Sequence, residues 1–288
     1  MPKKEPASNL LRCDFHCHSY YSDGMQSPTA VAAAMKQNQV SIFALTDHDT
    51  ISGVSEAQAA ARKEGICCLG GIELTIQWSC GTFHMLGLNL QYLQVLEEPL
   101  AQVQASRKER NGDMMKKLRK HGVDIDETKL QEYCETRDIL NRSHIAAYLV
   151  AKGYSTSYNE AFRHYLAHGA CAYVPIEGPS AQEGIEWIHA ARGRALLAHP
   201  HSLNLSWNRF KNYLDIWHKL GLDGLEISHP GISLKENKSL LKLAQYYRMQ
   251  YSGGSDYHRG ETVGTLGRGT AGRPIDLPAE MAYMKGGV

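Results

Sequence analysis

The stretch Ser41-Ile42-Phe43-Ala44-Leu45-Thr46-Asp47-His48-Asp49 joins the most strand-like apolar run of the chain to a group of ionisable residues. A run of this length and composition predicts a buried β-strand. Three ionisable residues directly after it do not fit a core pattern. In folds that alternate strands and helices, active sites lie at the carboxyl ends of the strands. The stretch therefore predicts both an α/β fold and the position of its site.

Six other apolar or β-branched runs also predict strands, and helical periodicity lies between most of them. The seven predicted strands are Leu11–His18, Val40–Thr46, Ile66–Leu74, Phe83–Leu90, Arg194–His199, Gly224–Ser228 and Gln250–Gly253. The predicted helices are Pro28–Asn38, Ser52–Glu64, Ala181–Ala191, Asn208–Leu220 and Ser233–Arg248. Ser27 before Pro28 is a typical helix start, and Gly65 and Gly221 are typical stops. This alternation indicates parallel βα units.

Residues 97–172 interrupt this alternation, with three or four helical segments and no convincing strand. We expect an inserted helical subdomain here, with 1–96 and 173–288 forming the main domain. Between Arg107 and Lys120 the excess of basic over acidic residues is 7 − 2 = 5. We expect these basic side chains on a solvated helix face; the alternative is a patch that guides an anionic substrate. The apolar stripe of this helix would be Leu96, Leu100, Val103, Met114 and Leu118. The Gly-rich tail beyond Thr262 is expected to be irregular.

The composition is that of a soluble globular protein. The chain has 288 residues and a mass of 32.1 kDa, with 43% apolar and 21% charged residues and a mean hydropathy of -0.39. No apolar run approaches the roughly 18 residues of a membrane helix, and no signal-like segment follows the first residues. We therefore expect a cytoplasmic protein without a membrane partner. A net charge of +1 gives no reason to expect duplex DNA. Seven cysteines, two of them adjacent, favour reduced thiols.

Histidine is abundant, with 14 residues, and many of these lie at predicted strand ends together with carboxylates. His16 and His18 share one face of a strand, because residues two apart point to the same side. Each motif alone is compatible with ordinary core or surface residues. Their repetition at one end of six strands is not, because packing does not place ionisable groups there repeatedly. The candidate metal ligands are His16, His18, Asp23, His48, Glu73, His84, His199, Asp256 and His258.

Imidazoles and carboxylates without thiolates suit Mn²⁺, Zn²⁺ or Fe²⁺ and tolerate Mg²⁺. Nine ligands are too many for one ion, so two or three ions are expected. Spacing alone leaves open how the ligands divide among them.

These residues, in this order, resemble the motifs of the polymerase and histidinol phosphatase (PHP) superfamily. The resemblance rests on the candidate ligands and on Ala198-His199-Pro200 and Ser255-Asp256-Tyr257-His258. The helical insertion with Asn141-Arg142-Ser143-His144, and Tyr173-Val174-Pro175 after it, are similar to one branch. That branch comprises nucleoside 3′,5′-bisphosphate phosphatases, also described as RNase AM-type 5′-to-3′ exoribonucleases.

The resemblance implies an α/β fold, a distorted (βα)7 TIM-like barrel with the inserted helical subdomain, and three divalent metal ions, for which we expect Mn²⁺. It also implies a division of the ligands. The first ion would be held by His16, His18, Glu73 and Asp256, the second by Glu73, His84 and His199, and the third by Asp23, His48 and His258.

The function expected from these residues is hydrolysis of a phosphomonoester by a metal-bound hydroxide. The branch implies the 3′-phosphate of nucleoside 3′,5′-bisphosphates as the target, with exoribonuclease activity on short RNA as an extension. Arg142 is the expected phosphate clamp and His144 a phosphate contact or proton donor, although both could simply cap or solvate a helix. His201 and His229, near strand ends, are candidates for a substrate or orienting role. Asp47 and Asp49 are expected to orient the ligand between them.

Two departures from the branch leave the nucleotide preference open. His201-Ser202-Leu203 follows Pro200 where the branch often has Gly-Arg-Tyr, and Glu177-Gly178 replaces a Gln-Trp pair. The alternatives are a histidinol-phosphatase-like enzyme for another small phosphomonoester and a non-catalytic, metal-stabilised module.

Overall fold

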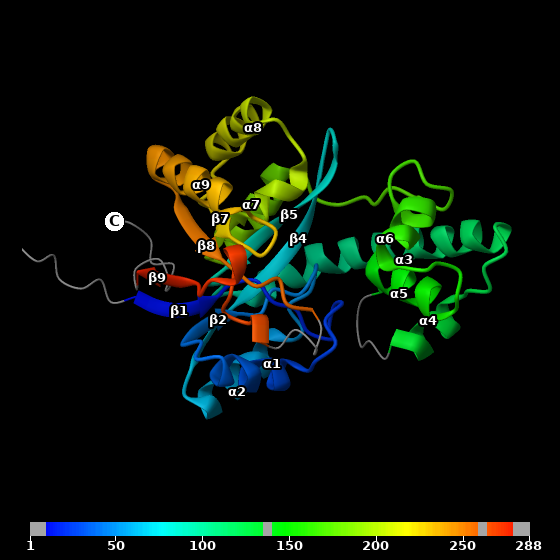
Figure 1. The fold of residues 1–288 in the computed structure, drawn as a ribbon, viewed down its shortest axis with the longest axis horizontal. Helices are drawn as coiled ribbons and strands as arrows, with labels where there is room; N and C mark the ends of the chain where they lie inside the picture. The colour runs from blue at the N-terminus through cyan, green and yellow to red at the C-terminus, as the bar shows by residue number, and fades with distance from the viewer. Residues whose placement is uncertain (1–9, 135–139, 259–263, 279–288) are drawn as a thin grey trace, which may run out of the picture.

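The chain is an α/β protein in which strands and helices alternate outside one helical segment (Figure 1). A computed structural model describes residues 10–134, 140–258 and 264–278. No described helix is long and apolar enough to cross a membrane.

The strands form two sheets. One has the order β3-β2-β1-β9, and the other has the order β4-β5-β6-β7-β8. The first sheet consists of β1 (Leu10–Asp14), β2 (Ile42–Ala44), β3 (Cys67–Leu69) and β9 (Asp276–Pro278). The second consists of β4 (Gly71–Trp78), β5 (Gly81–Leu88), β6 (Arg194–Leu197), β7 (Gly224–Ser228) and β8 (Gln250–Gly253).

The expected parallel arrangement holds for β1–β2, β2–β3, β6–β7 and β7–β8, but β4–β5 and β5–β6 are antiparallel. Two residues, Ser79 and Cys80, connect β4 to β5, and so short a connection can only close a hairpin. The single strand predicted over Ile66–Leu74 is divided at Gly70 into β3 and β4. A side chain at Gly70 would lie 2.4 Å from the Leu90 carbonyl oxygen, so close approach of the chain requires glycine here.

The two sheets are joined on both sides by isolated bridges between the segments that extend their strands. The bridges pair Cys17 with Tyr257 on one side and His48 with Glu73 on the other. The described residues thus form two linked sheets and not one continuous ladder of strands. Four of the bridging residues belong to or flank the predicted motifs, so the links lie at the predicted site.

Five helices flank the sheets and agree with the predicted helices to within a few residues. They are α1 (Pro28–Gln37), α2 (Val54–Glu64), α7 (Ala181–Ala190), α8 (Trp207–Lys219) and α9 (Leu234–Tyr247). Helices α1 and α2 lie beside the first sheet, and α7 to α9 lie beside the second (Figure 1). The Ser27 side chain caps α1, and Gly65 ends α2 with φ 68°. Two of the core clusters are formed by the apolar faces of these helices and sheets.

The segment predicted as an insertion is helical and projects away from the sheets (Figure 1). A short 3-10 turn (Leu93–Leu96) precedes it. Its elements are α3 (Glu97–Lys120), α4 (Glu127–Cys134), α5 (Arg142–Ala151), α6 (Tyr158–Ala161) and a π-helical turn (Phe162–Leu166). No strand occurs in the described parts of 97–172. A hydrophobic cluster of its own includes Met114, Leu118, Ile145 and Leu166.

Two expectations, one for this part of the chain and one for the tail, are wrong in part. Five of the basic side chains between Arg107 and Lys120 are exposed as expected, namely Lys108, Lys116, Lys117, Arg119 and Lys120, but two are not. Arg107 and Arg110 are not solvated but only 6% and 5% exposed, because the face of α3 that carries them is covered by the strand ends and by the start of α5. The described tail is not wholly irregular. It contains a 3-10 turn at Thr270–Gly272 and the strand β9, which pairs antiparallel with β1 and covers its edge.

Candidate metal centre

The structure brings all nine predicted ligands together at one end of the strands. Most of them follow a strand directly: His16 and His18 come after β1, His48 after β2, His199 after β6, and Asp256 and His258 after β8. Glu73 and His84 lie within β4 and β5, and Asp23 lies in the loop after His18. A parallel sheet presents its carboxyl ends at one edge, which explains how residues so far apart in sequence converge.

Four groups of side chains have ligand atoms within 4.8 Å of one another. The groups are His18, Asp23, His48 and His258; His16, Glu73 and His199; His16, His18 and Asp256; and His48, Glu73 and His84. Each group combines imidazole nitrogens with at least one carboxylate, which is the donor set of a divalent cation site. Several residues belong to two groups, so the groups form one continuous cluster.

Glu73 lies at the centre of this cluster and is 1% exposed. Its Oε1 is 2.9 Å from His84 Nδ1 and 3.0 Å from His199 Nε2. Its Oε2 faces His16 Nε2 at 3.2 Å, His18 Nε2 at 3.3 Å and His48 Nδ1 at 3.0 Å. With one oxygen toward each set of imidazoles, this carboxylate has the geometry to be shared between two cations.

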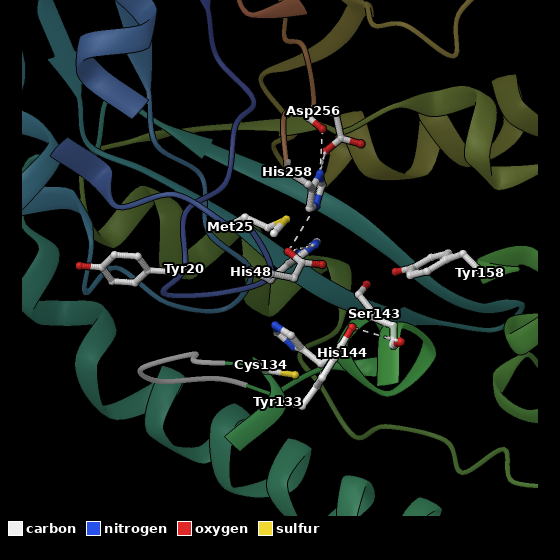
Figure 2. Close-up of a pocket in the computed structure, with 13 residues that line it drawn as sticks. Tyr20, Met25, His48, Tyr133, Cys134, Ser143, His144, Tyr158, Asp256 and His258 are labelled. Atoms are coloured by element: carbon white, nitrogen blue, oxygen red, sulfur yellow. Dashed lines mark hydrogen bonds and ion pairs between the residues drawn. The ribbon is translucent and has the colours of Figure 1, made fainter. Parts of the chain in front are cut away.

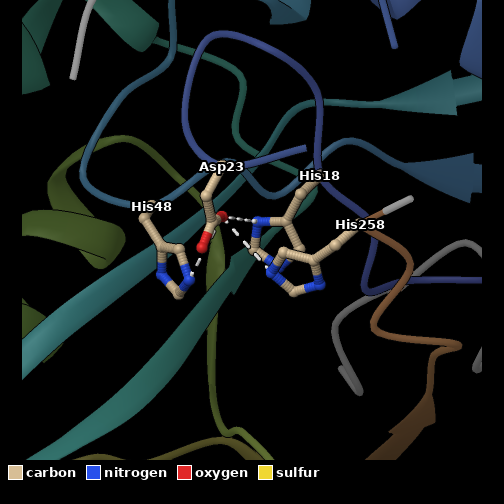
Figure 3. Close-up of side chains that lie close together, drawn as sticks. All are labelled: His18, Asp23, His48 and His258. Carbon is tan, nitrogen blue, oxygen red and sulfur yellow. Dashed lines mark ion pairs between the residues drawn. The ribbon is translucent and has the colours of Figure 1, made fainter. Parts of the chain in front are cut away.

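Asp23 occupies a similar position in the group drawn in Figure 3, between His48 on one side and His18 and His258 on the other. Its Oδ1 is 3.3 Å from His258 Nε2 and 3.7 Å from His48 Nε2. His18 takes part through both nitrogens, because its Nδ1 is 3.9 Å from Asp23 while its Nε2 faces Glu73 and Asp256.

Unsatisfied polar atoms show that the cluster fits metal ions. Five ligand atoms are buried and make no hydrogen bond: His16 Nε2, His18 Nε2, Asp23 Oδ1, His48 Nδ1 and Glu73 Oε2. Buried polar atoms are normally paired, and each one left unpaired is unfavourable. Five such atoms facing one another would all be satisfied by divalent cations. The residues present therefore fit divalent metal ions.

Electrostatics within the cluster keeps its carboxylates ionised. Despite burial, these carboxylates raise the pKa of His16 well above its usual value and that of His258 to about 10 when no cation is bound. Burial alone would raise the pKa of Glu73, but the His16 and His48 imidazoles outweigh it and hold this pKa well below its usual value. The same balance, mainly with His258, lowers the pKa of Asp23. Burial lowers the pKa of His48 to about 3. Ionised carboxylates and a neutral imidazole are the protonation states in which these groups bind metals.

Glu226, in the middle of β7, belongs to the site and was not predicted. It is fully buried, its Oε1 lies 3.2 Å from His16 Nδ1, and its Oε2 accepts the backbone N–H of His199 at 2.6 Å. A carboxylate behind a ligand imidazole fixes the orientation of the ring and the nitrogen that carries its proton. The signal that could have revealed Glu226 is a single acidic residue inside the otherwise apolar Gly224–Ser228 strand.

Other buried carboxylates hold the loops that carry the ligands. Asp47 accepts hydrogen bonds from the Ser19 amide (2.7 Å) and the Ser22 hydroxyl (2.6 Å), in the loop between His18 and Asp23. Asp49 accepts from the Thr75 amide at 2.7 Å and pairs with Arg107 of α3.

Asp14, which was not predicted, accepts from the amides of Ser255 (2.9 Å) and Gly267 (2.8 Å), and burial raises its pKa to about 6. The segment before Asp256 is thereby tied to the strand that leads to His16.

The backbone around the ligands is constrained. His199, Asp256 and Asp49 have positive φ values of 27°, 51° and 51°. Left-handed conformations of non-glycine residues are unfavourable and often mark functional sites. A side chain at Gly254 would place its Cβ 2.1 Å from the Cβ of His16, so glycine is required for the approach of these two segments.

A cavity of about 1010 Å³ opens beside the cluster, between the strand ends and the inserted helices. Figure 2 shows His48 and His258 on one side of it and Ser143 and His144 of α5 on the other. Its wall also includes Tyr20, Met25, Tyr133, Cys134 and Tyr158. Both the ligands and the insertion thus contribute to one cavity.

The three predicted substrate residues are placed differently. His144 lines the cavity, and its Nδ1 accepts the Asn141 N–H at 3.0 Å as part of a capping box. A neutral imidazole that accepts at Nδ1 carries its proton on Nε2. Arg142 is the first residue of α5, with its guanidinium 5.9 Å from the centre of the Phe162 ring, and does not line the cavity itself.

His201 does not line the cavity either; its ring lies 5.0 Å from that of His229. His229 has the closer link to the cluster. Its Nδ1 accepts the Gly231 N–H at 2.9 Å, and its Nε2 is 3.3 Å from Asp256 Oδ2.

An α/β fold whose strands end in a buried cluster of imidazoles and carboxylates defines a protein with a site suited to divalent cations. A model of the PHP domain matches residues 14–242. The chain therefore belongs to the PHP domain family of phosphoesterases, and it is an enzyme that hydrolyses phosphoric esters.

Known relatives cover most of the chain. A 5′-3′ exoribonuclease of Haemophilus influenzae is 34% identical over 85% of this chain and 89% of its own length. A 3′,5′-nucleoside bisphosphate phosphatase of Chromobacterium violaceum is 30% identical over 93% of each chain. The structure of an amidohydrolase from Chromobacterium violaceum with bound sulfate superposes with a TM-score of 0.86 and 28% identity, covering 95% of this chain and 96% of that one.

Proposed function

We propose that the protein is a metal-dependent phosphatase that removes the 3′-phosphate from nucleoside 3′,5′-bisphosphates. The observation that carries the proposal is the set of five buried ligand atoms without hydrogen bonds, beside a cavity that the insertion helps to line. The nine clustered residues would hold three divalent ions, with Mn²⁺ as the expected metal. Bound ions would lower the pKa of water and neutralise phosphate oxygens, which is the chemistry that phosphoester hydrolysis needs.

The residues of the insertion would complete the reaction. His144 directs the N–H of Nε2 away from its cap, and so can donate a hydrogen bond to a phosphate oxygen or to the leaving oxygen. The proton that the leaving oxygen takes up would come from another group, because a neutral imidazole is too weak an acid to supply it. Burial lowers the pKa of His144, so the ring is neutral near pH 7 and keeps this single donor. Arg142 would hold a phosphate through its planar guanidinium. His201 would act at the edge of the site, beside His199 and His229.

The size of the cavity and the named relatives support a nucleotide substrate. At about 1010 Å³ it is at the upper end of the range for small-molecule sites, which is roughly 300–1,000 Å³. It could therefore hold more than one nucleotide, and short 5′-phosphorylated RNA is included in the proposal as a second substrate. The relatives at 34% and 30% identity are named for these two activities.

We further propose that the two linked sheets are parts of a distorted (βα)7 barrel formed by 1–96 and 173–288, and that 97–172 is an inserted subdomain. The bridges on both sides of the sheets and the separate hydrophobic cluster of the insertion support this division.

The test is phosphate release by protein of measured metal content. The substrates are adenosine 3′,5′-bisphosphate, AMP, histidinol phosphate and a short 5′-phosphorylated RNA. We expect the bisphosphate to have the highest kcat/KM, and activity to disappear with chelator and return with Mn²⁺. Activity on histidinol phosphate alone would overturn the nucleotide assignment.

Two variants separate the metal site from the substrate site. Glu73→Gln should lose both metal and activity, because it removes the shared carboxylate. Arg142→Ala should keep its metal but lose activity, and Arg163→Ala, an exposed arginine of the same insertion, is the matched control. An unchanged kcat/KM in Arg142→Ala would remove the clamp from the proposal.

A further inference from the structure

Helices α8 and α9 border a groove on the part of the molecule that lies away from the inserted helices (Figure 1). The volume of this α8–α9 groove is about 550 Å³. Six of the residues that line it are Trp207, Lys211 and Asp215 of α8 and Lys242, Tyr246 and Tyr247 of α9. None of these six described residues lines the cavity beside the metal cluster, so the groove and the cavity are separate.

Helices α8 and α9 concentrate the positive charge of an almost neutral chain. They hold six lysine or arginine residues and two acids, an excess of 6 − 2 = 4, whereas the whole chain has a net charge of +1. The rest of the chain is therefore negative, at 1 − 4 = −3. The six basic residues are Arg209, Lys211, Lys219, Lys235, Lys238 and Lys242. A local excess of this kind attracts anions even where the net charge of the protein does not.

Both acids of these helices are bound by uncharged donors. Asp215 accepts the hydroxyl of Tyr247, and Glu236 accepts the Ser233 N–H at 2.9 Å in the capping box of α9. Among the described residues, no carboxylate forms an ion pair with any of the six basic side chains. Their positive charge is thus free to meet a ligand. Exposed lysines alone can simply be solvated, so the charge does not by itself identify a site.

Two exposed aromatic rings in the same groove provide the second observation. Tyr246 is 80% exposed and Trp207 is 43% exposed. Both rings rest on a neighbouring ring: that of Trp207 lies 5.6 Å from the buried Phe210, and that of Tyr246 lies 5.1 Å from Tyr247, which Asp215 fixes through its hydroxyl. Flat rings held in place beside basic side chains are the features on which proteins stack the bases of a single strand.

We propose that the α8–α9 groove binds single-stranded RNA. Lys211 and Lys242 would contact its phosphates, and Trp207 and Tyr246 would stack on its bases. A duplex fits less well, because its base faces are already stacked on one another. An anionic membrane would meet the same charge, but membrane-binding helices present a continuous apolar face, whereas the rings here line a groove together with lysines.

A groove that is separate from the cavity gives the protein a preference for longer substrates. A free nucleotide in the cavity does not touch the groove, whereas an RNA of several nucleotides can occupy both. The groove would then hold the body of an RNA chain whose end lies at the metal cluster. This link to hydrolysis rests on the proposed function, but the binding of RNA at the groove does not.

Anisotropy of a labelled RNA measures binding directly. The probe is a single strand of about 12 nucleotides, within the usual range of single-strand site sizes, with phosphorothioate linkages that slow its hydrolysis by the metal-loaded protein. We expect Tyr246→Ala to raise Kd about 5- to 100-fold, as for the loss of one stacked base. Tyr246→Phe keeps the ring and should bind as wild type does. Because Tyr246 is exposed, both variants should have the Tm of wild type.

Salt dependence tests the lysines. With Lys211→Gln and Lys242→Gln combined, the slope of log K against log salt should become less steep by about 1.4, because each phosphate contact with a single strand contributes about 0.7. Lys36→Gln and Lys63→Gln, combined in the same way, are the matched control, because these exposed lysines belong to α1 and α2 beside the first sheet. An equal change in this control would mean that the whole surface attracts RNA, and would overturn the groove.

Two further ligands distinguish single-stranded RNA from the other partners of a basic, aromatic surface. A duplex of the same sequence offers phosphates without free base faces, and a vesicle of phosphatidylserine and phosphatidylcholine offers negative charge without bases. We expect both to bind more weakly than the single strand, and Tyr246→Ala to leave their binding unchanged. Equal binding of the duplex, or a loss in Tyr246→Ala that occurs only with vesicles, would overturn the proposal.

Hydrolysis separates the groove from the proposed function. For adenosine 3′,5′-bisphosphate, kcat/KM in Tyr246→Ala should equal that of wild type. For a 5′-phosphorylated RNA of the probe's length, KM should rise as much as Kd does while kcat is unchanged. RNA binding at the groove without hydrolysis of any nucleotide would refute the proposed function and leave the groove. Hydrolysis of the bisphosphate together with wild-type RNA binding in every groove variant would refute the groove alone.

Discussion

Replacing Glu226 by glutamine should weaken metal binding by changing which nitrogen of His16 carries the proton. Glu226 is fully buried and contacts two ligand residues, with Oε2 on the His199 N–H at 2.6 Å and Oε1 at 3.2 Å from His16 Nδ1. In wild type the carboxylate accepts the proton of Nδ1, which leaves Nε2 free to bind a metal.

In Glu226→Gln, the amide oxygen can keep the bond to the His199 N–H, and the NH₂ group then faces His16. An NH₂ group only donates, so His16 must accept through Nδ1 and carry its proton on Nε2. That nitrogen is the one that faces Glu73 (3.2 Å) and Asp256 (3.3 Å). Changes to such partners of a ligand histidine typically lower metal affinity about 10- to 100-fold, which corresponds to about 1.4 to 2.7 kcal/mol.

Titration calorimetry of the metal-free protein with Mn²⁺ measures this, together with metal analysis of the purified variant. Glu186→Gln is the matched control, because Glu186 is an exposed residue of α7 that bonds only Gln182 among the described residues, at 2.9 Å. We expect the control to bind Mn²⁺ as wild type does. If Glu226→Gln binds Mn²⁺ with wild-type affinity, Glu226 does not control which nitrogen of His16 carries the proton, and its role is only to fill space.

Two further predictions concern stability. Gly254→Ala should destabilise the protein by about 3 kcal/mol and displace His16, because the new Cβ would lie 2.1 Å from that residue. Gly112→Ala, in open space on α3, should instead stabilise the protein by about 1 kcal/mol. Chemical denaturation of both variants measures the two changes in unfolding free energy. Without metal, the stability of the protein should fall at alkaline pH because of His258. Burial lowers the pKa of His258, but Asp23 outweighs this effect and raises the pKa to about 10. The folded state binds this proton more tightly than the unfolded state, and the resulting stabilisation is complete below the unfolded-state pKa of about 6.5 and is lost as the pH rises toward 10. The Tm of the metal-free protein should therefore fall over this pH range. A Tm that does not change with pH, or the same slope in His258→Gln, would contradict the role given to His258.

Most of the candidate ligands could be predicted because they break a local rule at a recognisable place; Asp23, in a loop, was placed by its position after His18 and by the family resemblance. His48 follows an apolar strand, and His16 and His18 share one strand face. Carboxyl ends of strands meet at one edge, so local patterns imply a cluster. Glu226 breaks the same rule in the middle of a strand, where a single acid can be noticed but its contacts cannot be inferred. Its role depends on which residues the neighbouring strands bring against it.

The buried arginines were predicted wrongly for a related reason. Periodicity identifies the apolar stripe of α3, and the expected members Leu100, Val103, Met114 and Leu118 are all buried. It cannot show that a second, charged face is also covered. Arg107 and Arg110 are buried because α3 runs from the strand ends to the start of α5, a tertiary arrangement that no helical repeat records.

The insertion and the strand ends both contribute residues to the cavity, and polar contacts join the two parts. The insertion has its own hydrophobic cluster, so its junction with the strands does not depend on a shared apolar core alone. Hydrogen bonds and an ion pair hold this junction near the ligands. Gln104 donates to the Asp49 carbonyl at 3.0 Å, and Arg107 pairs with the Asp49 carboxylate. Ser106 donates to the Glu177 carbonyl at 3.1 Å. Asp49 directly follows His48, so the same residue holds the insertion and adjoins a metal ligand. This junction thereby places the basic side chain of Arg107 next to the strand end that carries His48.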